Sequence, residues 1–313
     1  MAGQLDIVLN QIVIFAILMA IGFIAVKAKA LTKDALNALS RLIVLIILPA
    51  LIFSIMAGSG VRISDFLNNG AFAIGVALCY TLLIISGIVM SRLLKLEGKT
   101  ANIYMSLATF GNMGFMGIPL LLGIFSDPVV QVCIAVYTVI DMALLWTYGV
   151  YLCSRHQDSS NPLSTIKNMI NPTTVALLIG FIIMAVRLPV PGLLMSTITG
   201  IGNTSKYLTL IYIGGVLAYV SLAKVSTKSN ILILTAVKML ALPVIVFILL
   251  GFFLPLEQRT ILTLIVGLPG MTTVAMIASN YQSDVEYATE IIFVTTLASL
   301  VTIPLVFIAT SLI

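Results

Sequence analysis

Charged residues are scarce in this sequence. Of its 313 residues only 9% are charged, whereas 60% are hydrophobic and the mean hydropathy is +1.19. A soluble protein carries about a quarter charged residues, and no polar stretch here is long enough to form a separate soluble domain. The scarcity of charge therefore excludes an ordinary soluble protein. The net charge of +5 comes from lysines and arginines in short loops, so it does not indicate a nucleic-acid partner.

Cysteine and catalytic motifs are scarce as well. Cys79, Cys133 and Cys153 are isolated, odd in number and set within apolar runs, which indicates neither a disulfide framework nor a metal site. The sequence has no HExxH, no GxSxG and no phosphate-binding glycine loop. A membrane aspartyl protease needs two intramembrane aspartates, and only Asp141 lies inside an apolar run. We therefore expect no enzyme, no cofactor and no metal.

Apolar runs of about 20 residues, the length that crosses a bilayer, recur from one end of the chain to the other. They predict an all-α polytopic membrane protein whose first run is a span rather than a signal peptide, because no basic segment precedes this run and no small-residue cleavage site follows it. The sixth run is short, and Gly200–Ser205 interrupts the long seventh, so that pair could be divided differently. The ten expected spans are Ile7–Val26, Ala35–Met56, Gly70–Leu94, Ala101–Phe125, Val129–Cys153, Pro172–Val186, Pro191–Leu222, Ile231–Leu254, Glu257–Asn280 and Val285–Ile313.

Basic residues alternate between the loops and predict the orientation. Loops after even-numbered spans carry only Arg62, Arg187 and Arg259. Loops after odd-numbered spans carry Lys27, Lys29, Lys33, Arg92, Lys95, Lys99, Arg155, Lys167, Lys224 and Lys228. Because cytoplasmic loops are enriched in lysine and arginine, the second group is expected in the cytoplasm and both termini outside it.

Two helix-breaking motifs occupy matching places in the two halves. The fourth span contains Gly117–Pro119 and the ninth contains Gly267–Pro269, each within a run that also holds other glycines, Gly114 and Gly270. With five spans per half, the second half enters the membrane in the opposite sense, which predicts two inverted five-helix repeats. The expected division is residues 1–156 and 171–313, with a cytoplasmic linker at 157–170.

The breaks predict an anion site at the membrane centre. Pro119 and Pro269 cannot donate a backbone hydrogen bond, and each can begin a half-helix whose first N–H groups carry partial positive charge. Half-helices entering from opposite sides can converge on a carboxylate, while the freed carbonyls could hold a water or a cation. Asn112, Thr272 and Thr273 supply side-chain hydrogen bonds in the same zone. Proline and glycine are also ordinary kinks and packing points in membrane helices.

Asp141 and Lys238 lie near the middles of the fifth and eighth spans. Ionisable residues inside a membrane are costly and usually mark partners or ion and proton pathways. The two residues could form a structural ion pair. Alternatively, Asp141 could carry a coupling proton, and Lys238 could attract an anion or contact freed carbonyls.

Several segments of the sequence resemble those of a known family. The segments "GNMGFMGIPLL" and "GLPGMTTVAMIASNYQSD" are similar to the two crossover segments of the auxin efflux carrier family, which includes bacterial organic-acid permeases. The blocks "RLIVLIILPALIF" and "TTLASLVTIPLVF" also resemble the family, so the likeness covers most of the chain. It implies an X-shaped crossing of helices four and nine, an elevator-like mechanism and a homodimer. It also implies a site at Asn112 and Pro119 and at Pro269 with its following turn, Gly270–Thr273.

The expected function is a secondary transporter of small organic anions such as malate, malonate or auxin-like acids, embedded in the cell membrane. The hydroxyl-rich turn after Pro269 favours a small polar carboxylate over indole-acetate. Two alternatives stay open. One is a sodium-coupled symporter of the bile-acid-carrier type, and the other is a membrane anion sensor that does not transport.

Overall fold

The computed structural model describes residues 2–58, 64, 68–125, 127–156, 172–219 and 229–312. Over these ranges the chain is almost entirely helical, and its one strand-like element is an isolated bridge of two residues. The linker expected at 157–170 lies outside the described residues, as do Arg62, Lys167, Lys224 and Lys228.

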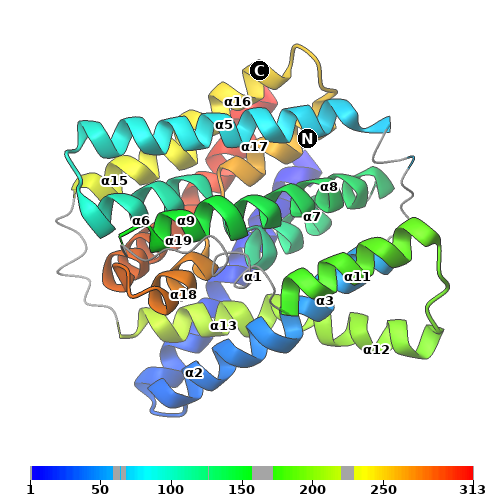
Figure 1. Cartoon of the computed structure of the whole chain (residues 1–313), viewed down its shortest axis with the longest axis horizontal. Helices are drawn as coiled ribbons and strands as arrows, with labels where there is room; N and C mark the ends of the chain where they lie inside the picture. Colours follow the sequence, from blue (N-terminus) through cyan, green and yellow to red (C-terminus); the bar gives the residue numbers. More distant parts are fainter. Residues whose placement is uncertain are drawn as a thin grey trace.

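Helices of the first half begin and end within a few residues of the apolar runs (Figure 1). Three of the first five runs contain a wide π-type turn, named η. The elements are α1 (Ala2–Lys27), α2 (Lys33–Leu42), η1 (Ile43–Ile47), α3 (Leu48–Gly58), α5 (Gly70–Leu93), α6 (Gly98–Thr109), η2 (Met113–Gly117), α7 (Ile118–Ile124), α8 (Pro128–Leu144), η3 (Leu145–Gly149) and α9 (Val150–Ser154).

The second half has a similar succession of helices. Thr204 separates two helices in the long seventh run, where Gly200–Ser205 predicted an interruption. The elements are α11 (Pro172–Val186), α12 (Gly192–Asn203), α13 (Ser205–Leu217), α15 (Ser229–Ala236), η4 (Val237–Ala241), α16 (Leu242–Leu250), α17 (Leu256–Val266), α18 (Thr272–Asn280) and α19 (Val285–Leu312).

Five uninterrupted helical stretches of the described chain are long and apolar enough to cross a membrane. They are Lys33–Gly58, Gly70–Leu93, Val129–Ser154, Ser229–Leu250 and Val285–Thr310, and shorter apolar helices cover Val13–Lys27, Met113–Ile124 and Pro172–Val186. Large apolar side chains project outward from these helices; for example, Val186 is 69% and Ile74 65% exposed. An apolar exterior over apolar helices is the surface expected of a protein solvated by lipid.

Wide turns accommodate three of the prolines. η1, η2 and η4 each end two residues before a proline, at Pro49, Pro119 and Pro243. A proline within a helix clashes with the carbonyl four residues earlier, and a locally wider turn relieves that clash. The same local widening therefore accompanies Pro119 at the broken fourth span and Pro49 and Pro243 in the second and eighth spans.

The helices pack into two groups. In the first group α1 packs along α13, while α3 packs against α11 and α12. In the second group α5 packs on α6, α16 on α17, and α18 on α19, and α8, α9 and α15 join this group through α5, α6 and α19. Figure 1 shows α3, α11 and α12 together at one side of the molecule, away from α5, α15 and α16. We call these groups the scaffold group (α1, α2, η1, α3, α11, α12, α13) and the core group (α5–α9, α15–α19 and their wide turns).

Candidate functional site

Two extended segments cross at the centre of the core group. The first joins α6 to η2, the second joins α17 to α18, and they pair in antiparallel fashion at Gly111 and Gly270. The Asn112 N–H donates to the Pro269 carbonyl over 2.9 Å, and the Met271 N–H donates to the Phe110 carbonyl over 3.2 Å. Each broken helix therefore satisfies part of its exposed backbone through the other, as a membrane interior requires.

The pairing gives a register that the motif match did not predict. The match aligns Gly117–Pro119 with Gly267–Pro269, but the paired residues are Gly111 and Gly270. Pro269 lies in the extended break itself, whereas Pro119 lies one wide turn into the second half-helix, at the start of α7. The expectation that Pro119 begins the half-helix is therefore wrong: that half-helix begins at Met113, because the chain leaves helical geometry already at Phe110.

The glycines around the crossing allow close contacts. A Cβ on Gly117 would lie 2.7 Å from Leu268 Cδ1 of the other segment, and one on Gly111 would lie 3.1 Å from Leu268 Cβ. A Cβ on Gly114 would approach Leu48 of α3 to 3.3 Å, so this glycine faces the scaffold group. The absence of a side chain at Gly111 and Gly117 thus lets the two segments approach each other closely.

Polar side chains at the crossing lack partners. Asn112 is fully buried, and neither its amide oxygen nor its amide nitrogen has a hydrogen-bond partner in the structure. Thr272, at the first position of α18, is 8% exposed and its hydroxyl also has no partner. Thr273 beside it is equally buried. Buried amides and hydroxyls are normally hydrogen-bonded. The side-chain amide of Asn112 and the hydroxyl of Thr272 can therefore each accept or donate a hydrogen bond to a ligand or a water at the crossing.

A cavity between the two helix groups reaches Thr272, whereas Asn112 is not among the described residues that line it. It holds about 380 Å³, and Thr272 forms part of its wall. The scaffold side consists of Asn37 and Ser40 of α2 with the end of α13, and the core side consists of α18 and the first turns of α19. None of the described residues that line it carries a charge. A second, smaller cavity of about 240 Å³ lies between α3 and α12 on the scaffold side and α7 and α8 on the core side.

Lys238 of η4 reaches the end of α6. Its side chain is 2% exposed, and Nζ donates to the carbonyls of Leu107 (2.5 Å) and Phe110 (2.8 Å). The contact with freed carbonyls, one of the alternatives expected for this lysine, is thus formed. The ion pair with Asp141, the other structural alternative, is not formed: the structure, which describes both side chains, has no direct bond between them.

Asp141 belongs to a separate polar cluster beside the crossing. Oδ1 accepts a hydrogen bond from the Tyr80 hydroxyl of α5, and Tyr80 and Tyr137 hydroxyls are 2.8 Å apart. Because Tyr80 has one proton and the carboxylate only accepts, Tyr137 donates to Tyr80 and Tyr80 to Asp141. The other oxygen of Asp141, Oδ2, has no partner. Asp141 does not line either cavity described above.

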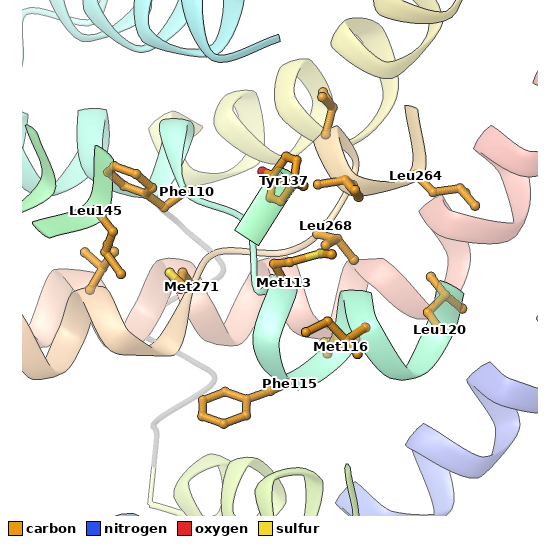
Figure 2. Packing of buried hydrophobic residues seen from close by; sticks show 14 of the residues in the cluster. Phe110, Met113, Phe115, Met116, Leu120, Tyr137, Leu145, Leu264, Leu268 and Met271 are labelled. Carbon is orange, nitrogen blue, oxygen red and sulfur yellow. The ribbon is translucent and has the colours of Figure 1, made fainter. Parts of the chain in front are cut away.

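The bulky residues of the first crossover segment are packing residues. Met113, Phe115 and Met116 are at most 3% exposed and belong to the main hydrophobic core. Figure 2 shows Met113 next to Leu268 of the opposite segment, with Met116 and Leu120 following along the same half-helix. Met113 thus packs against the other broken helix, and none of the three bulky side chains lines the larger cavity.

A family model described as "Membrane transport protein" matches the sequence twice, over residues 7–162 and 156–307. Together these matches cover nearly the whole chain, including both crossing segments. The chain belongs to the auxin efflux carrier family of membrane transport proteins. A comparison with curated proteins gives no match. Membership of the auxin efflux carrier family, together with the apolar helices, makes this a multi-pass membrane transporter.

Thr295 of α19 is a residue of the crossing that was not predicted from the sequence of this auxin efflux carrier family member. Its hydroxyl accepts from the Gly270 N–H over 3.0 Å and donates to the Ile291 carbonyl over 2.7 Å. Thr295 therefore anchors the second crossing segment to α19. The only sequence signal is a threonine in the middle of an apolar span, and Thr296 beside it carries the same signal without making this contact.

We expect Thr295→Val to lower thermal stability. Valine fills the same space but leaves the buried Gly270 N–H without an acceptor, a loss of about 1–3 kcal/mol. The matched control is Thr310→Val on the same helix, because Thr310 is also buried and donates only within α19, to the Phe307 carbonyl. Thermal unfolding of the purified proteins compares the two. An equal effect of both substitutions would contradict the anchoring role.

Proposed function

We propose that this protein is a secondary transporter that binds a small organic anion at the crossing of its two broken helices. The observation that carries the proposal is the pairing of Gly111 with Gly270. In each segment the second half-helix begins two residues after the paired glycine, at Met113 and at Thr272. Two helix N-termini from opposite directions therefore start at one place, next to the unpartnered Asn112 and Thr272 side chains.

The electrostatics of this place favour an anion. The first N–H groups of a helix have no acceptor within the helix, and they carry a partial positive charge. Both N-termini act on the same buried region, where low polarity strengthens their effect. Since the cavity wall is uncharged over the described residues, recognition by N–H groups, hydroxyls and an amide suits a carboxylate. The volume of about 380 Å³ accommodates small acids such as malate, malonate or an auxin-like acid.

Helix packing supports a division into two inverted five-helix repeats, residues 1–156 and 171–313. In this division the first span corresponds to the sixth and the second span to the seventh. The contact between α1 of the first span and α13 of the seventh therefore corresponds to the contact between α11 of the sixth span and α3 of the second. Likewise α5 on α6 corresponds to α16 on α17, and α7 on α8 to α18 on α19. The ten membrane spans inferred from the sequence fit this scheme, which is the inverted arrangement of many transporters.

The two cavities support an elevator-type alternating access. Each lies between the scaffold group and the core group. The larger cavity contacts α2 and α13, whereas the smaller one contacts α3 and α12, at the other ends of the same two spans. Movement of the core group along the scaffold group would expose the crossing to either side in turn. With the lysine-rich loops in the cytoplasm, the larger cavity lies on the cytoplasmic side, because Asn37 in its lining is close in sequence to Lys33.

The Thr272 hydroxyl provides the test of this site. We expect Thr272→Val to raise the KM for carboxylate uptake about tenfold, the effect of removing one hydrogen bond to a charged ligand. Stability should change little, since the hydroxyl has no partner in the protein. Thr260→Val is the control, because Thr260 is a half-buried residue of α17 whose hydroxyl bonds only to the Leu256 carbonyl. Uptake into proteoliposomes from a panel of mono- and dicarboxylates measures the effect.

An unchanged KM for Thr272→Val with every transported carboxylate would remove Thr272 from the site. A membrane anion sensor is the alternative from another functional class. It would bind a carboxylate and show the same thermal stabilisation, but it would give no uptake above that of empty liposomes.

A further inference from the structure

We propose that Lys238 is a built-in cation of the crossing, occupying with its ammonium group the position where a monovalent metal ion would otherwise bind. This inference rests on the proposed transport function and concerns its coupling ion. It assigns to the wild-type protein an anion transport that needs no sodium.

The position of the ammonium group is defined by two main-chain carbonyls. α6 ends at Thr109, and the carbonyls of a helix's last turn have no partner within the helix. Leu107 and Phe110 direct theirs to Lys238 Nζ at 2.5 and 2.8 Å, and Phe110 also accepts from Met271. Broken helices of transporters use such freed carbonyls and C-terminal helix ends to coordinate a coupling cation. Here a side chain of the protein fills that place.

The charges around Lys238 match this role. The C-terminal end of α6 carries partial negative charge, which favours a cation. Asp141 of α8, Tyr80 and Tyr137 form the neighbouring polar cluster, and Lys238 has no direct bond to any of them. A buried ammonium is costly unless hydrogen bonds compensate it, and Lys238 donates to two carbonyls. The lysine therefore neutralises the C-terminal end of α6 at the same crossing where the N-termini of η2 and α18 attract an anion.

The experiment measures thermal unfolding of the purified protein in chloride salts of sodium, potassium, methylammonium and choline at equal ionic strength. We expect the wild-type Tm to be the same in all four. Lys238→Ala should lower the Tm in choline by about 5–10 °C, because the carbonyls of Leu107 and Phe110 lose their buried cationic donor. Sodium or methylammonium, which fit the vacated space, should restore a good part of this loss, whereas choline is too large. Lys206→Ala is the control, since Lys206 lies on α13 over the rings of Phe15 and Tyr207, and its Tm should not depend on the cation.

Three results would overturn the proposal. They are a wild-type Tm that rises specifically with sodium, a Lys238→Ala protein as stable as wild type in choline, and a Lys238→Ala protein destabilised equally in all four salts. If Lys238→Ala does not fold, the wild-type series still decides, and sodium-dependent uptake by wild type contradicts the proposal in the same way. The salt series contains no organic anion, so its outcome is independent of whether the transported substrate has been identified correctly.

Discussion

Asn112→Asp is expected to reduce carboxylate uptake by at least about a hundredfold, because like charges brought together in a buried site repel by several kcal/mol. Asn112 is fully buried, its side chain has no partner, and its own N–H forms the crossing by donating to Pro269. Aspartate has nearly the same shape, so the substitution changes the charge at the site and leaves its geometry in place. The initial rate of uptake into proteoliposomes measures the effect.

Asn102→Asp is the matched control. Asn102 is also buried and lies on α6, the helix that precedes the first crossing segment. Its side-chain oxygen accepts a hydrogen bond from Arg155 Nε over 2.6 Å. An aspartate there would pair with the arginine, so uptake should stay within about twofold of wild type. If the folded Asn112→Asp protein transports carboxylates with wild-type kinetics, the anion does not bind near Asn112.

Gly214→Ala is expected to prevent stable folding. A Cβ at Gly214 would lie 1.9 Å from the Met19 carbonyl oxygen, and one at Gly22 would lie 1.9 Å from the Ile211 carbonyl oxygen. α1 and α13 thus touch backbone to backbone, and neither backbone can move aside as a flexible side chain would. Overpacking at such a contact should cost more than about 4 kcal/mol, in the range where single substitutions unfold proteins. Thermal unfolding and the yield of monodisperse protein in detergent measure it.

Gly200→Ala serves as the comparison for Gly214→Ala. Gly200 is exposed on α12, and nothing lies within 4 Å of the place where its Cβ would be. Alanine also favours a helix by about 1 kcal/mol over glycine, so this variant should be at least as stable as wild type. A Gly214→Ala protein with wild-type stability would mean that α1 and α13 do not pack as closely as described.

The helix boundaries could be predicted because they depend on local properties of the sequence. Pro172–Val186 was predicted residue for residue, and the break near Thr204 followed from the glycine and asparagine before it. Apolar length, loop charge and helix-breaking residues are all readable along one stretch of chain. The existence of two broken helices was predictable for the same reason.

The register of the crossing could not be predicted in this way. The Gly117–Pro119 and Gly267–Pro269 motifs resemble each other, but the structure pairs Gly111 with Gly270, through backbone atoms that every residue has. The particular carbonyls that Lys238 contacts could not be predicted for a similar reason. Every residue has a backbone carbonyl, so nothing in the sequence distinguishes those of Leu107 and Phe110. The contact of Gly270 with Thr295 depends on how α19 packs against the crossing, which only the folded chain determines.

Substrate counterflow shows whether the protein carries a bound carboxylate across the membrane. Proteoliposomes containing the wild-type protein are loaded with an unlabelled carboxylate, and the entry of a trace of the labelled acid is followed over time, with choline as the only added cation. We expect a transient accumulation of label that depends on the internal acid and is absent from Asn112→Asp proteoliposomes. Binding of the acid without any counterflow, for every carboxylate that raises the Tm of the protein, would contradict the proposed transport.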